Sequence, residues 1–190
     1  MDGLAITTNY AGFLQLGLFF SGGTKLYRGR IHFMFDLDEA PAFGAAVNPG
    51  LITVTNAYLE TDIIAAVTSG TPNLNATISR CRRYDWDGDL LTWVKYNATN
   101  WTTAGAQDTT NDIDTSSTVA YSLQTAAGAQ TITGLTTLTQ DAIASRGNEV
   151  NLRIKIDDDT TDDDEDRYNR YDPTLTYLCV EYTRRRFFLT

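Results

Sequence analysis

Three segments of the chain alternate with a period of two residues, and this pattern constrains the fold more than any other feature. The segments are residues 28–37, 148–157 and 174–183. Because successive side chains of a strand point to opposite faces, such alternation predicts strands with one face buried. The positions that we expect to face the core are Ile31, Phe33, Phe35 and Leu37; Val150, Leu152, Ile154 and Ile156; and Leu178, Val180 and Tyr182.

The remaining segments favour the same class of fold. Weaker strand patterns occupy residues 13–19, 51–63, 75–84 and 118–125. A helical spacing occurs only in residues 135–147, where Leu138, Ala142 and Ile143 share a side and Gly147 predicts the stop. Strands without alternating helices predict an all-β, antiparallel β-sandwich or barrel with one short helix.

The length of the chain limits the number of its domains, and its net charge limits the classes of partner that it binds. The 190 residues suit one domain, which we assign to residues 1–183, followed by a basic and aromatic tail at 184–190. A net charge of -9 argues against nucleic acid and against an anionic membrane surface as partners. The N-terminus lacks the pattern of a signal peptide, so we expect synthesis in a cytoplasm. Cys81 and Cys179 are expected to be free thiols.

Catalysis has little support in the sequence. His32 is the sole histidine, and the alternation places it on the outer face of its strand. Phosphate-binding glycine loops and zinc-binding Cys and His pairs are absent from the sequence. A glycosidase needs two carboxylates in unlike environments, whereas the clustered carboxylates here are typical of solvated loops or cation sites. We therefore predict that the chain is not an enzyme.

Two acidic stretches suit calcium, which takes six to eight oxygen ligands. The sequence "DWDGD" at 85–89 departs from the EF-hand pattern, and the run at 157–166 is a dense carboxylate loop. Each stretch is either a calcium site or a solvated turn, and the residues leave both readings open. The candidate calcium ligands are Asp85, Asp87, Asp89, Asp157 and Asp159.

Aromatic residues gather between positions 84 and 101. Exposed aromatic rings on a sandwich stack on sugars, whereas buried rings form core, and the spacing does not decide between these roles. Trp93 lies in an apolar run, which favours core. The candidate glycan contacts are Trp86, Trp101, Tyr84 and Tyr96.

Taken in order, several segments resemble the DNRLRE family, a group of β-sandwiches similar to carbohydrate-binding modules. The resembling segments are residues 8–17, 27–41, 52–63, 84–108, 135–145 and 170–182. The resemblance implies a jelly-roll sandwich. Where the family has an asparagine after "TW", this chain has Val94, and its acidic run from Asp157 is denser than is usual in the family.

A sandwich of this kind without an export signal suggests a phage particle, whose proteins are made in the host cytoplasm and displayed on the virion surface. We therefore predict a virion surface protein, either a capsid decoration protein or a fibre component, in contact with other capsid subunits and forming a homo-oligomer. The expected assembly interface is the tail, with Arg184, Arg185, Arg186, Phe187 and Phe188. The alternative is an extracellular carbohydrate-binding module that recognises a polysaccharide.

Overall fold

A computed structural model of the chain describes residues 3–7, 14–21, 24–37, 51–68, 75–83, 98–103, 106–145, 148–157 and 166–184. Within these residues the elements follow in the order β1 (Gly3–Thr7), β2 (Leu14–Ser21), β3 (Thr24–Asp36), β4 (Ile52–Thr68), β5 (Asn75–Cys81), β6 (Ile113–Ser122), β7 (Gly128–Ile132), α1 (Thr136–Ser145), β8 (Glu149–Ile156) and β9 (Arg167–Arg184). No helix in the described ranges is long and apolar enough to span a bilayer.

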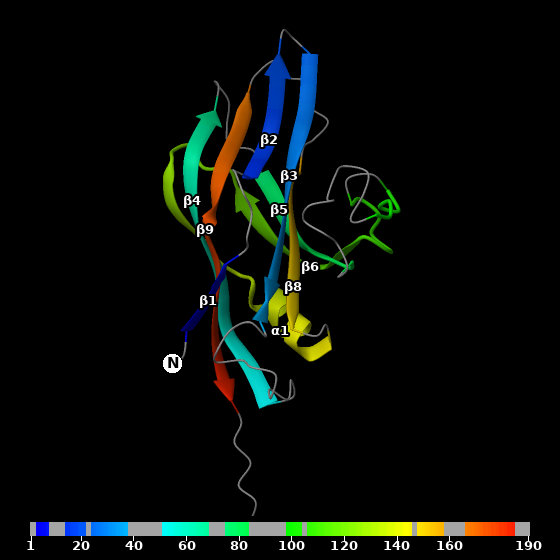
Figure 1. Cartoon of the computed structure of the whole chain (residues 1–190), viewed down its shortest axis with the longest axis vertical. Helices are drawn as coiled ribbons and strands as arrows, with labels where there is room; N and C mark the ends of the chain where they lie inside the picture. Colours follow the sequence, from blue (N-terminus) through cyan, green and yellow to red (C-terminus); the bar gives the residue numbers. More distant parts are fainter. Residues whose placement is uncertain are drawn as a thin grey trace, which may run out of the picture.

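The strands form two antiparallel sheets that share β3 (Figure 1). The first part of β3 pairs with β2, and the second part, from Arg30 to Asp36, pairs with β8. We call β1, β2, β9, β4 and β7 sheet A, and β3, β8, β5 and β6 sheet B. β9 pairs with β4 along most of its length, while its other edge pairs with β2 and then with β1. The predicted all-β antiparallel sandwich with one short helix is confirmed.

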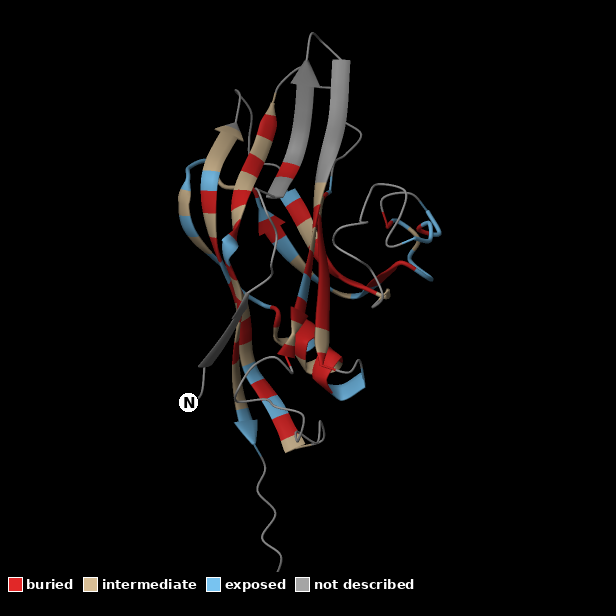
Figure 2. Ribbon diagram, viewed as in Figure 1, coloured by how far each residue is buried: buried red, intermediate tan, exposed pale blue. Residues whose placement is uncertain are grey.

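The main core lies where the apolar faces of the strands meet. Red bands of buried residues alternate with paler bands along β4 and β9 (Figure 2). All of the predicted inward positions in β3 and β8, and Leu37 directly after β3, are at most 1% exposed, and so are Leu178 and Val180 in β9. Tyr182 is only partly buried against this core. The alternation therefore identified the buried face of each of these strands.

The helix α1 closes one end of the sandwich against β4 and β8. Leu138, Ala142 and Ile143 are buried, as predicted. Two of its polar side chains bind the backbone of β4. Gln140 accepts a hydrogen bond from Val54 N at 2.7 Å, and Thr136 Oγ1 accepts one from Ala57 N at 3.2 Å. These bonds explain how a short helix with a weak apolar stripe is fixed in place.

Several features differ from the sequence-based prediction. β1 and β7 were not predicted, since both are short and carry no clear alternation. β9 begins at Arg167, earlier than predicted, and includes Pro173 next to an irregularity in its register with β4. Arg184, which we assigned to the tail, is the last residue of β9 and pairs with Ile52. Residues 185–190 lie outside the described ranges.

Candidate functional site

The polar face of sheet B, opposite the main core, is the first part of the candidate site. One row of this face runs across three strands, because His32 of β3 lies opposite Arg153 of β8, and Arg153 lies opposite Ser79 of β5. Arg153 and Ser79 are nevertheless buried, at 7% and 1% exposed. Alternation placed Arg153 on the face opposite Leu152 and Ile154, which is correct, but it gave no sign that this face is also covered.

A second, smaller apolar cluster lies over this row. It consists of Cys81, Trp101, Ala106 and Ile113. Trp101 is 4% exposed, and its ring stacks on His32 with 5.5 Å between ring centroids. Arg153 donates a hydrogen bond from Nη1 to the carbonyl of Ala106. Trp101 therefore packs as core and has no open face for a sugar ring. The other candidate glycan contacts, Trp86, Tyr84 and Tyr96, fall outside the described ranges, as does Trp93.

Asp112 holds in place the chain around Trp101 that covers the polar face of sheet B, which we call the covering segment. Its carboxylate is fully buried and accepts hydrogen bonds from Thr102 N at 3.1 Å and Thr103 N at 3.0 Å. Arg83 Nε lies 3.7 Å from the same carboxylate. The bonded amides directly follow Trp101 in the chain, so Asp112 positions the backbone that places the indole over His32. Sequence reasoning missed this residue because its partners are backbone amides, which carry no sequence signal.

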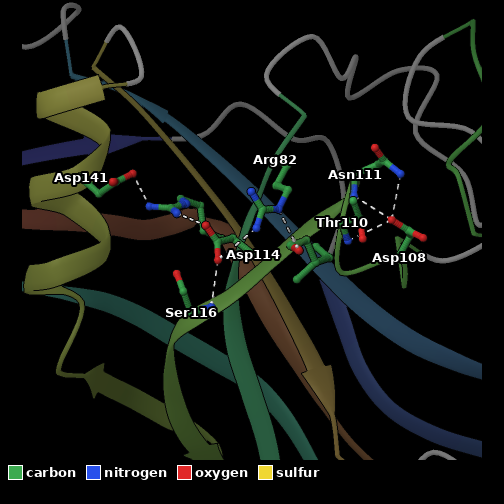
Figure 3. A network of polar contacts seen from close by, with 9 residues as sticks. Arg82, Asp108, Thr110, Asn111, Asp114, Ser116 and Asp141 are labelled. Carbon is green, nitrogen blue, oxygen red and sulfur yellow. Dashed lines mark hydrogen bonds and ion pairs between the residues drawn. The ribbon is translucent and has the colours of Figure 1, made fainter.

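Figure 3 shows the adjoining network of polar contacts, with Asp114 at its centre. Arg80 donates one hydrogen bond to Asp114 of β6 and another to Asp141 of α1. Ser116 N donates to Asp114 at 2.9 Å. Hydrogen bonds from Ser116, together with Arg80, hold the pKa of Asp114 well below its usual range. Arg80 thus joins β5, β6 and α1 through charged hydrogen bonds.

The cysteine and histidine of this region lie in contact, but their acid–base properties oppose catalysis. Cys81 Sγ is 3.5 Å from His32 Nδ1. Burial raises the pKa of Cys81 to about 12. A nucleophilic cysteine requires a lowered pKa, because the thiolate is the reactive form. The His32 pKa is lowered to about 3 by burial first and then by Arg153 and Arg30, which leaves a very weak base. Cys81 and His32 are therefore placed like a catalytic Cys–His pair, but their pKa shifts do not favour formation of a thiolate.

We expect His32 to stay neutral in the folded protein from pH 8 down to about pH 4. His32 is half-buried as a residue, and the desolvation of its ring together with Arg153 and Arg30 opposes protonation. Since the unfolded chain takes up this proton near pH 6.5, the contribution of His32 to stability is complete above that pH and is lost as the pH falls toward 3. As the only histidine, it gives one assignable ring signal in an NMR titration. A midpoint between pH 6 and 7 in the folded protein would contradict the burial of this ring, and the urea-unfolded chain provides the control.

The calcium prediction concerns residues of which only one has a described position. Asp157 is exposed, and its carboxylate accepts a hydrogen bond from Thr77 Oγ1. Asp85, Asp87, Asp89 and Asp159 lie outside the described ranges. Among the residues that are described, no three His, Cys, Asp or Glu side chains are grouped as a metal site requires. Calcium at either acidic stretch stays a prediction.

Comparison with known proteins adds no further constraint on the site. No protein-family model and no curated protein matches the chain. The function must therefore be inferred from the geometry described above.

Proposed function

We propose that this chain is a non-catalytic structural and interaction protein, most specifically a surface component of a phage virion such as a capsid decoration or fibre-associated protein. Its sandwich would be of the DNRLRE type that the sequence resembles. The proposal that the chain is non-catalytic rests on the pKa values of Cys81 and His32. The raised pKa of Cys81 disfavours a nucleophilic thiolate, and the lowered pKa of His32 makes it a weak base.

The charged groups around this pair support the same proposal. Arg80, Asp112 and Asp114 are each at most 7% exposed, and each binds partners in neighbouring elements. Such interactions fix a scaffold, whereas catalytic groups need access to a substrate.

An assembly role is supported by the position where β9 ends and by the sequence that follows it. The β4–β9 pair extends beyond α1 at one end of the molecule (Figure 1), and β9 reaches Arg184 at its tip. The next residues are Arg185, Arg186, Phe187 and Phe188. Arginine and aromatic residues are enriched in protein interfaces, so this end is suited to contact a neighbouring subunit.

The proposal is tested by assembling particles with the full chain or with a chain that ends at Arg184. This truncation leaves β9 complete, because Arg184 is its last paired residue. We expect the truncated chain to be incorporated several-fold less, as measured by mass spectrometry of gradient-purified particles. A chain that ends at Phe188 is the matched control and should be incorporated normally.

Two outcomes would oppose the proposal. Absence of the full chain from purified particles would overturn the virion role. Selective binding to a polysaccharide on a glycan array, in a chain that does not associate with particles, would instead favour the carbohydrate-binding module.

A further inference from the structure

The outer face of the β4–β9 pair carries an acidic and tyrosine-rich surface on the side of sheet A opposite the core. We call it the acidic β4–β9 face; its members are Tyr58, Glu60 and Asp62 of β4 and Asp172, Tyr177 and Glu181 of β9. Each of these residues is partly or fully exposed. The neighbouring inward residues, including Leu59 and Leu178, are completely buried, which fixes the orientation of the two strands.

The register arranges this face in rows across the ribbon. Tyr58 pairs with Cys179, Glu60 pairs with Tyr177, and Asp62 pairs with Asp172. Alternate residues of a strand are about 7 Å apart, so Tyr58, Glu60 and Asp62 recur at this interval along β4, whereas the register with β9 shifts between Glu60 and Asp62. Glu181 continues the pattern towards the end of the ribbon that carries Arg184.

Between Asp172 and Glu181 the charge on this face is of one sign, and Arg170, two residues before Asp172 on the same face of β9, bounds it at one end. Neither residues 56–62 nor residues 172–181 contain a lysine or arginine, and the flanking strands β1 and β7 contain none either. The pKa of Tyr58 is raised by Cys179 first, then by burial, and also by Glu60 and Glu181, whose carboxylates add a negative local potential. A basic partner is therefore favoured on this surface.

The chain contains one segment with the complementary chemistry. Arg184, Arg185 and Arg186 are followed by Phe187 and Phe188. Arginine forms charged hydrogen bonds with carboxylates and stacks on tyrosine rings. In an extended segment, Arg184 and Arg186 are also about 7 Å apart, which matches the spacing of the rows.

The segment cannot cover the face of its own copy. Cys179 lies about 17 Å along β9 from Arg184, whereas Phe188 lies at most about 14 Å beyond Arg184 even in a fully extended chain. A segment that turns back can therefore reach Glu181, about 10 Å from Arg184, but falls short of Tyr177 at about 23 Å, so that it covers only one end of this face. The complementary face that it can occupy in full is that of another molecule.

We propose that the Arg184–Phe188 segment of one copy docks on the acidic β4–β9 face of a second copy. This inference rests on the proposed assembly role of the tail and adds the surface that receives it. In a closed dimer, each copy would dock its segment on the face of the other. In a ring, each copy would dock its segment on the face of the next copy, so both arrangements use the same contact.

The test is sedimentation equilibrium of the isolated full chain at low salt, with a reductant present because Cys179 lies on this face. We expect reversible self-association that weakens at high salt. Reversal of the tail charges (Arg185→Glu with Arg186→Glu) and reversal of the face charges (Glu60→Lys with Glu181→Lys) should each weaken association about tenfold or more. A mixture of the two variants should associate again, because the charges are then complementary in the opposite sense.

Matched controls separate docking from misfolding. Asp157→Lys makes the same kind of charge reversal as one of the two face substitutions, at an exposed position directly after β8, and should leave association intact. Glu60→Gln with Glu181→Gln removes the charge with little change in shape, and circular dichroism confirms the fold of each variant. Association that survives tail reversal, or a mixture that stays monomeric, would overturn the proposal.

The results also separate this inference from the proposed function. If the isolated chain is monomeric at all concentrations while its truncation lowers incorporation into particles, the tail docks on a different virion protein and only the present inference fails. If the chain self-associates through this face but is absent from particles, the virion role fails instead.

Discussion

Replacing Arg80 with methionine is expected to lower the free energy of unfolding by about 3 to 5 kcal/mol, the cost of breaking a buried ion pair by removing one partner. The side chains of Arg80 and Asp114 are 9% and 7% exposed, so the remaining carboxylate would be left buried without its guanidinium. The second bond of Arg80, to Asp141, would be lost as well, and with it a link between β5 and α1. Urea denaturation followed by circular dichroism gives the measurement.

Arg82 provides a matched control for this prediction. It lies 3.5 Å from the same Asp114 carboxylate, but its side chain is 37% exposed. We therefore expect Arg82→Met to cost at most about 1 kcal/mol. If Arg80→Met and Arg82→Met lower the free energy of unfolding equally, the buried Arg80–Asp114 pair contributes no more stability than a surface contact.

The pH dependence of the same network follows from the lowered pKa of Asp114. A carboxyl whose pKa is depressed by folding stabilises the protein fully above its unfolded value of about 3.9, and this contribution is lost as the pH falls through the folded value. The destabilisation caused by Asp114→Asn should accordingly be constant between pH 7 and pH 5 and shrink under more acidic conditions.

The strand faces were predictable because alternation reports which residues lie on the same side of a sheet. The residues around Ile31, Leu152 and Val180 carry this signal clearly. The same signal says nothing about whether the opposite face is covered. Arg153 is buried because a segment distant in the sequence, with Trp101 and Ala106, packs over it and accepts its hydrogen bond.

Arg80 is a charged residue whose need for a buried partner can be recognised in the sequence. It continues the inward positions of Ala76 and Ile78, so alternation alone places a charged residue on the apolar face. A charge in that position needs a buried partner, and this requirement is visible in the sequence. The identity of the partner was not predictable, since a register shift after Ser79 brings Arg80 opposite Asp114.

The candidate site was predicted only in part. The sequence left Trp101 open between a sugar contact and core, and the structure places it in the core against His32. His32 was expected on the outer face of its strand, and it lies there, but its contact with Cys81 joins residues from different strands and had no local signal. Asp112 was missed for a related reason, because its function is to bind backbone amides.

Replacing Asp112 with alanine is expected to destabilise the protein by about 2 to 3 kcal/mol and to release Trp101 from its contact with His32. The substitution leaves the part-buried amides of Thr102 and Thr103 without their acceptor and removes a fully buried carboxylate that binds both, and these losses account for the destabilisation. The free energy is measured by urea denaturation. Release of the indole is measured as a shift of tryptophan emission to longer wavelength, with Trp101→Phe identifying the contribution of this ring.

Asp108 supplies the control that separates a buried acceptor from an exposed one. Its carboxylate also accepts hydrogen bonds from two backbone amides, those of Thr110 and Asn111, but these bonds lie at the exposed surface. Water can replace the acceptor there, so Asp108→Ala should cost no more than about 1 kcal/mol and leave the emission of Trp101 unchanged. If Asp112→Ala behaves in the same way as Asp108→Ala, the covering segment is held by the apolar cluster alone. If Asp112→Ala instead causes a larger loss of stability and a red-shifted emission, the covering segment is held by the buried carboxylate. Of the two carboxylates compared, that of Asp112 is the one that binds the amides following Trp101.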